Sequence, residues 1–83
     1  MYLTRAQAGV TYRVKTVRDT GPRACRLMEM GLIEGAEVRL VRRAPLGDPL
    51  QLRVGDYDLS VRASDAELIE ITDPEALAET SRH

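Results

Sequence analysis

At 83 residues, the chain has room for one domain and for no second hydrophobic core. Its composition is 43% hydrophobic and 30% charged, which is typical of a globular domain and argues against disorder. A formal net charge of −1 excludes a general long-range attraction to nucleic acid or to anionic lipid. The sequence shows no signal peptide and no apolar run near the ~20 residues that span a bilayer. We therefore expect a cytoplasmic protein with no direct membrane insertion.

The N-terminal segment predicts one helical turn followed by a strand. Thr4 is expected to cap a turn over residues 4–8, and Leu3 to anchor that turn in the core. Apolar and polar residues then alternate from 10 to 15, which is the period of a half-buried strand. The alternation breaks at Thr16, so we expect either a β-bulge there or departure of the strand from its sheet.

A helix is predicted over residues 23–30, with Pro22 in the first turn, where its missing N–H costs nothing. Three residues at helical spacing form its apolar stripe, namely Ala24, Leu27 and Met28. Cys25 lies beside this stripe and is expected to be a small buried hydrophobe. Gly31 stands where a left-handed C-terminal cap belongs, with Leu32 folding back on the last turn.

A second strand is predicted over residues 37–43, after a turn at Gly35. Its alternation shifts at Val41, so a strong bend is expected there. Residues 44–49 then form a loop, because two prolines and one glycine exclude regular structure.

Two further strands, residues 50–54 and 57–62, predict a hairpin. Gly55 suits the first position of a two-residue primed turn, since glycine takes a positive φ without penalty. The side chains expected to face inward are Leu50, Leu52, Val54, Tyr57, Leu59 and Val61. A capping-box spacing of Ser64 and Glu67 predicts one more helical turn.

A last strand is expected over residues 68–71, and a short helix that frays in the tail over residues 73–79. Five short strands with one helix between the first and second predict a mainly β fold, a small barrel with one-turn helical connectors.

The residue types needed for chemistry are scarce. His83 is the only histidine and is the terminal residue, and Cys25 has no histidine base inside the fold. One cysteine and one histidine far apart do not have the spacing of a soft-metal site. We therefore predict no enzyme, no catalytic residue and no metal ligand. Basic and aromatic residues are not interleaved as base stacking requires, so no nucleic-acid partner is expected either.

The loop over residues 44–49 combines apolar side chains with a backbone stiffened by proline. Loops of this kind carry function when a rigid scaffold positions them, and stiffness lowers the ordering cost of binding. Two interpretations of this segment are therefore equally supported: a partner-binding loop and a plain connector between strands.

Three segments together resemble the ferrous iron transport protein A family, the FeoA domain. They are residues 28–38 (MEMGLIEGAEV), 43–49 (RAPLGDP) and 59–62 (LSVR), in the order and spacing of that family. The resemblance covers Leu3 to Ile71. It implies an SH3-like barrel over residues 1–72, followed by a tail over 73–83.

The resemblance also implies a function. It implies a small cytosolic accessory that contacts a membrane ferrous iron transporter carrying a G-protein domain. No cofactor is implied, although weak Fe or Zn binding and self-association stay open. The same domain type forms the C-terminal domain of iron-dependent repressors, so a metal-sensing module is the alternative function. Within these 83 residues no DNA-binding segment lies ahead of the domain, so we expect the transport form.

Eight residues match the family at its two motifs, the helix end and the loop. We interpret Gly31 and Gly35, with Gly55 of the hairpin, as structural turns. The partner-binding candidates are Met30, Leu32, Pro45, Leu46, Gly47 and Asp48. The helix end and the loop are expected to form one apolar cleft.

Overall fold

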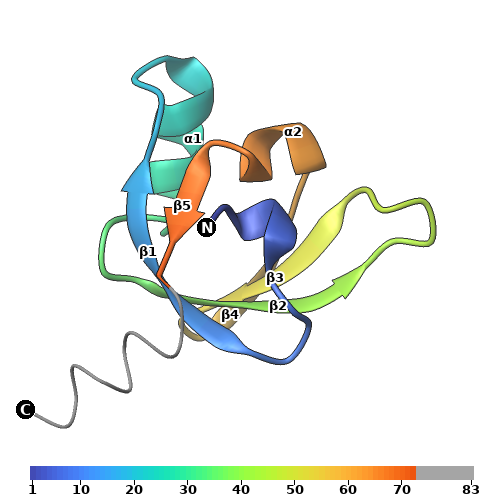
Figure 1. Ribbon diagram of the computed structural model, residues 1–83. Coiled ribbons are helices and arrows are strands. Elements are labelled where there is room, and N and C mark those ends of the chain that lie inside the picture. The colour runs from blue at the N-terminus through green and yellow to red at the C-terminus, as the bar shows by residue number, and fades with distance from the viewer. Residues whose placement is uncertain (73–83) are drawn as a thin grey trace, which may run out of the picture.

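A computed structural model describes residues 1–72 (Figure 1). The tail helix predicted over residues 73–79 lies outside the described residues. The elements follow in the order η1 (Leu3–Arg5), β1 (Thr11–Val17), α1 (Pro22–Glu29), β2 (Glu37–Arg43), β3 (Leu50–Val54), β4 (Tyr57–Val61), α2 (Ala63–Ala66) and β5 (Ile69–Ile71). The mainly β fold, with a helix inserted between the first two strands, is confirmed.

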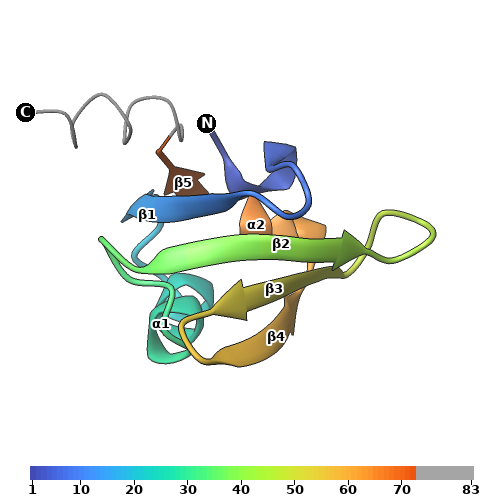
Figure 2. The ribbon, with the colours of Figure 1, turned by 90° about the horizontal axis from the view of Figure 1, so that it is seen from below.

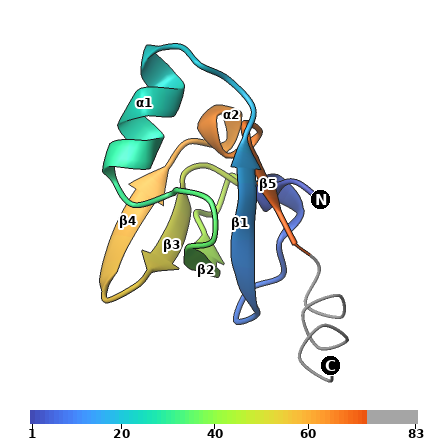
Figure 3. The same ribbon diagram turned by 90° about the vertical axis from the view of Figure 1, so that its left-hand side faces the viewer.

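The five strands of residues 1–72 form one antiparallel sheet in the order β4-β3-β2-β1-β5 (Figure 2). β1 has two partners along its length, because Thr11–Arg13 pair with β2 and Val14–Val17 pair with β5. The register shifts between Val14 and Thr16, which confirms the predicted bulge and shows that the strand stays in the sheet. The sheet therefore curves around its core, and α1 and α2 both lie on the same side of the strands (Figure 3).

β2 contains a second irregularity, at the predicted bend. Its register with β3 shifts between Leu40 and Arg42, so Val41 is the extra residue of a bulge. Val41 is 44% exposed, whereas Leu40 beside it is buried.

The bulge also returns Arg43 to the side of the sheet on which η1 lies. There the Arg43 Nη2 donates to the carbonyl oxygens of Thr4 (2.8 Å) and Ala6 (2.9 Å). Leu3 of η1 is fully buried, as predicted, but η1 has no side-chain cap, so the capping role predicted for Thr4 is wrong. A distant guanidinium stabilises this turn instead.

The core contains side chains from every element. Its largest fully buried members are Leu3, Leu32, Leu40, Leu50, Leu52, Ile69, Ile71, Val14 and Val38. No polar or charged residue within residues 1–72 is buried. A domain of this size therefore depends on apolar packing for its stability.

α1 buries a narrower stripe than predicted. Ala24 and Leu27 are buried, but Met28 is 39% exposed and Cys25 is exposed. The helix has only eight residues and lies over one end of the sheet, so residues about 100° around the axis from its buried line face solvent. The buried positions predicted for Met28 and Cys25 are wrong for this reason.

Candidate partner-binding site

The C-terminal end of α1 is a Schellman motif. The Gly31 N–H donates to the Met28 carbonyl at 3.0 Å, and the Leu32 N–H donates to the Leu27 carbonyl at 3.1 Å. Gly31 has φ 102, which confirms the predicted left-handed cap. This turn folds Leu32 into the core, where it is 0% exposed. Leu32 has no surface to offer a partner, so its predicted contact role is wrong.

The same helix end is packed against β4. The Tyr57 hydroxyl donates to the Met30 carbonyl, which places the tyrosine ring beside Gly31. A Cβ atom at Gly31 would overlap the Tyr57 hydroxyl oxygen and would lie 3.4 Å from Val54 Cγ1. Tyr57 was expected to face inward, but it is 48% exposed because its ring spans from β4 to the helix end. Met30 is half-buried in this junction, which leaves part of its side chain accessible.

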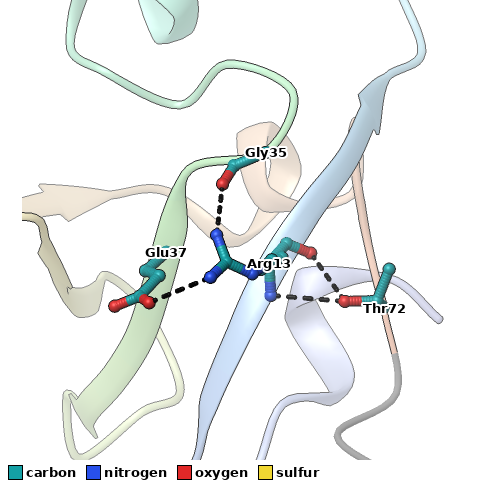
Figure 4. Close-up of polar contacts among 4 residues, drawn as sticks. All are labelled: Arg13, Gly35, Glu37 and Thr72. Atoms are coloured by element: carbon teal, nitrogen blue, oxygen red, sulfur yellow. Dashed lines mark hydrogen bonds and ion pairs between the residues drawn. The ribbon is translucent and has the colours of Figure 1, made fainter. Parts of the chain in front are cut away.

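The turn between α1 and β2 is fastened to β1 (Figure 4). The Gly35 N–H donates to the Val14 carbonyl at 2.8 Å, and Arg13 Nη1 donates to the Gly35 carbonyl at 2.9 Å. Arg13 Nη2 also lies 3.3 Å from Glu37 Oε1. The φ of 86 at Gly35 agrees with its interpretation as a turn residue. The helix end is therefore a rigid junction.

The loop over residues 44–49 projects from the other end of the sheet. Its base is closed by a hydrogen bond from the Ala44 N–H to the Pro49 carbonyl (3.0 Å), and its tip by one from the Gly47 N–H to the Ala44 carbonyl (2.7 Å). Gly47 has φ 87, which glycine adopts without strain. Leu46 at the tip is 97% exposed, and Pro45 beside it is exposed. An ordered backbone thus presents a leucine side chain to solvent.

Asp48 fastens this loop to α2. Its Oδ1 accepts a hydrogen bond from the Ala63 N–H at 2.8 Å, at the start of that helix. The N-cap residue of α2 is Arg62 and provides no side-chain cap, so the capping box predicted for Ser64 is wrong. One carboxylate therefore orders the loop and satisfies a helix N–H at the same time.

The helix end and the loop do not form one cleft. They lie at opposite ends of β2, whose seven residues separate them, a span of about 20 Å at the usual rise of a strand. Figures 1 and 2 show the loop and α1 on opposite sides of the molecule. The hollow beside the loop, about 400 Å³, is lined by Asp48, Pro49 and Arg62, with no residue of the helix end. The single apolar cleft expected from the sequence is therefore wrong.

The described part of the chain offers no metal cluster. Within residues 1–72, no three His, Cys, Asp or Glu side chains lie close enough together to hold a metal ion. His83 lies outside the described residues. None of the helices within residues 1–72 has the length and apolar character needed to cross a membrane.

A curved five-stranded antiparallel sheet with an inserted helix and an exposed, hydrogen-bonded loop defines a small SH3-like module. Residues 1–73 match the FeoA domain, and the chain therefore belongs to the FeoA domain family. The predicted resemblance is confirmed.

Similar proteins include a fusion of Fe(2+) transport protein A with the Fe(2+) transporter FeoB from Porphyromonas gingivalis. It is 35% identical over 71 residues, which are 86% of this chain and only 8% of that protein. Iron(II) transport protein A from Clostridium thermocellum is 37% identical with a TM-score of 0.82, over 86% of this chain and 44% of that one. The chain thus spans less than half the length of these two relatives.

A FeoA from Stenotrophomonas maltophilia, described as a procaryotic SH3 domain protein, was solved in complex with zinc. It is 32% identical with a TM-score of 0.77, over 87% of this chain and 89% of that one. The metal-bound protein ScaR shares the fold, with a TM-score of 0.77 at 19% identity, over 88% of this chain and 35% of that one.

Proposed function

We propose that this domain is an accessory of ferrous iron transport that acts by contacting the FeoB-type transporter on its cytosolic side. Membership of the FeoA domain family supports the link to iron transport. The fusion protein of P. gingivalis supports the choice of partner, because joining two domains in one chain keeps each at a high effective concentration near the other.

The observation that carries the contact hypothesis is the exposure of Leu46. At 97% it is far above the other exposed large apolar residues of residues 1–72, of which Ile33 is next at 51%. Covering a leucine side chain stabilises a complex by about 1.5–3 kcal/mol. We propose Leu46 as the anchor that enters a pocket on the transporter, with Pro45 beside it.

The hydrogen bonds of the loop make this contact less costly. Ala44 and Gly47 close the loop within its own backbone, and Asp48 fastens it to α2. Because the loop is ordered before binding, little conformational entropy is lost on association. In this proposal Gly47 and Asp48 shape the loop, while Met30 lies at the other end of β2 and belongs to a separate surface.

We propose further that residues 1–72 are the binding unit and that residues 73–83 are a tail outside it. The domain would act as an adaptor that supplies binding surface and no catalytic group.

The test is calorimetric titration of the purified protein with the cytosolic part of the FeoB-type transporter of the same organism. Leu46→Asp should weaken binding by roughly 10- to 100-fold, since the anchor is lost. Ile33→Asp is the matched control, because Ile33 is exposed and apolar but lies at the other end of β2. Equal affinities of the wild type and Leu46→Asp would refute the role of the loop.

Metal sensing is the second candidate function, and the zinc complex of the S. maltophilia protein favours it. Residues 1–72 bring no three ligand side chains together, so we expect them to bind Fe(II) or Zn(II) without fixed stoichiometry. Anaerobic titration of the full chain with Fe(II) distinguishes the two functions. A stoichiometric binding isotherm would favour metal sensing over an adaptor role.

A further inference from the structure

The two edges of the sheet differ in whether another segment of the chain is hydrogen-bonded to them. At the β5 edge, the Ile71 N–H donates to the Met1 carbonyl at 2.7 Å, and Tyr2 forms a bridge with Glu70, so the N-terminal residues cover it. At the β4 edge, no backbone hydrogen bond within residues 1–72 joins the strand to any segment other than β3. An edge of this kind is a template for another strand.

The hairpin register decides which backbone groups are free. Val54 and Tyr57 flank a two-residue turn and are therefore a hydrogen-bonded pair. Such pairs alternate along an antiparallel ladder, so Leu59 also bonds to β3, whereas Asp58 and Ser60 direct their N–H and C=O groups to the open edge.

The side chains along this edge form a self-complementary series. Asp58, Ser60 and Arg62 alternate on the exposed face, as an acid, a neutral residue and a base. If a second copy pairs antiparallel with Ser60 opposite its own counterpart, each Asp58 lies opposite an Arg62. Opposite charges in directly facing positions are favourable and like charges are unfavourable. A register centred on Asp58 or on Arg62 would instead place two like charges opposite each other.

The same register is compatible with the remaining groups. The Asp58 Oδ1 lies 3.4 Å from Arg53 Nη1 of its own copy, which leaves its second carboxylate oxygen for Arg62 of the other copy. On the inner face it places Leu59, which is only partly buried, opposite Val61 of the other copy. The two Ser60 residues exchange both backbone hydrogen bonds, and each Arg62 N–H reaches the Asp58 carbonyl of the other copy. The Arg62 carbonyl already accepts from the Asp65 and Ala66 N–H groups at 3.0 Å, so it takes no part.

We propose that the chain associates with a second copy of itself through antiparallel β4 strands centred on Ser60, which joins two sheets into one. This inference does not depend on contact with a transporter. A single pair of five-residue strands buries less than the ~1,200 Å² of a standard interface. The dimer is therefore weak and forms at high micromolar protein concentration.

A charge swap tests the register. Asp58→Arg or Arg62→Asp alone places like charges opposite each other twice per dimer and should raise the dissociation constant about tenfold. The double variant Asp58→Arg/Arg62→Asp restores two opposite-charge pairs and should return the constant to near the wild-type value. Sedimentation velocity over a concentration series gives the dissociation constant of the wild type, of the two single variants and of the double variant. Asp56→Arg is the control, because it changes the same charge in the hairpin turn, outside β4.

Two outcomes would overturn the proposal. A wild-type protein that stays monomeric at the highest concentration has no such dimer, and a double variant as weak as the single variants has a different register. A second measurement uses Ser60→Cys in a Cys25→Ser background, which removes the exposed native thiol. Mild oxidation should link two copies through Cys at position 60, and absence of that link would also count against the pairing.

Discussion

The junction between α1 and β4 predicts a large effect of Gly31→Ala on stability. Gly31 has φ 102, and an L-residue in the left-handed region costs about 1–2 kcal/mol. The new methyl group would also overlap the Tyr57 hydroxyl, which must then leave the Met30 carbonyl. Loss of that hydrogen bond adds about 1 kcal/mol. We expect a total of about 2–3 kcal/mol, which lowers the Tm of a domain of this size by roughly 10–20 °C.

Gly9→Ala separates the two causes of this loss. Gly9 also has a positive φ, of 84, but a Cβ atom there would meet nothing within 4 Å. It should therefore cost only the backbone term, about 1–2 kcal/mol. Urea unfolding of both variants, analysed by linear extrapolation, gives the difference.

A double variant tests the contact itself. Tyr57→Phe removes the hydroxyl that the methyl group of Gly31→Ala would strike, so the double variant should be more stable than the sum of the two single effects predicts. Strict additivity, or equal losses in Gly31→Ala and Gly9→Ala, would refute the reasoning from the Tyr57 contact.

Three further predictions concern long-range contacts and the loop. Asp48→Ala should lower the free energy of unfolding by about 1 kcal/mol, because α2 loses the acceptor for its first N–H. Thermal denaturation measures this loss, with Asp56→Ala as the control. Arg43→Met should cost about 1.5–3 kcal/mol, since two carbonyls of the η1 segment lose a charged donor, whereas Arg42→Met should be nearly neutral in the same assay. Leu46→Asp should change the free energy of unfolding by less than about 0.5 kcal/mol, and a larger loss in urea would show that the loop tip is structural.

Local patterns predicted the elements of this fold well. The alternation in β1 and β2 and the cap at Gly31 are set by residues close in sequence, so the strands, both irregularities and the helix end were predictable. The caps of η1 and α2 were not. Asp48 accepts the first N–H of α2 and Arg43 donates to two carbonyls of the η1 segment, both from distant positions. A spacing rule such as the capping box has no access to contacts between separate segments.

The candidate site was predictable only in part. Resemblance to a family identified the two motifs but not which side chains reach the surface, and Leu32 is buried because the Schellman turn folds it inward. The separation of the two motifs was open to simple reasoning, since a predicted strand of seven residues lies between them. The hydrogen bond of Tyr57 to the helix end had no signal in the sequence, because it joins residues 27 positions apart.

β2 separates the helix junction at one end of the strand from the exposed loop at the other, and the two ends should respond differently to substitution. At the start of β2, the helix junction is held by the Schellman turn and by Arg13, so substitutions there should lower the free energy of unfolding. At the end of β2, the loop is held by its own backbone and by Asp48, but the side chain at its tip packs against nothing. Substitutions at the tip should therefore change the affinity for the proposed partner and not the stability. The β4 edge runs along the side of the sheet and ends short of the loop tip (Figure 2). The proposed self-association and the proposed transporter contact should therefore respond to different substitutions, because they use different side chains.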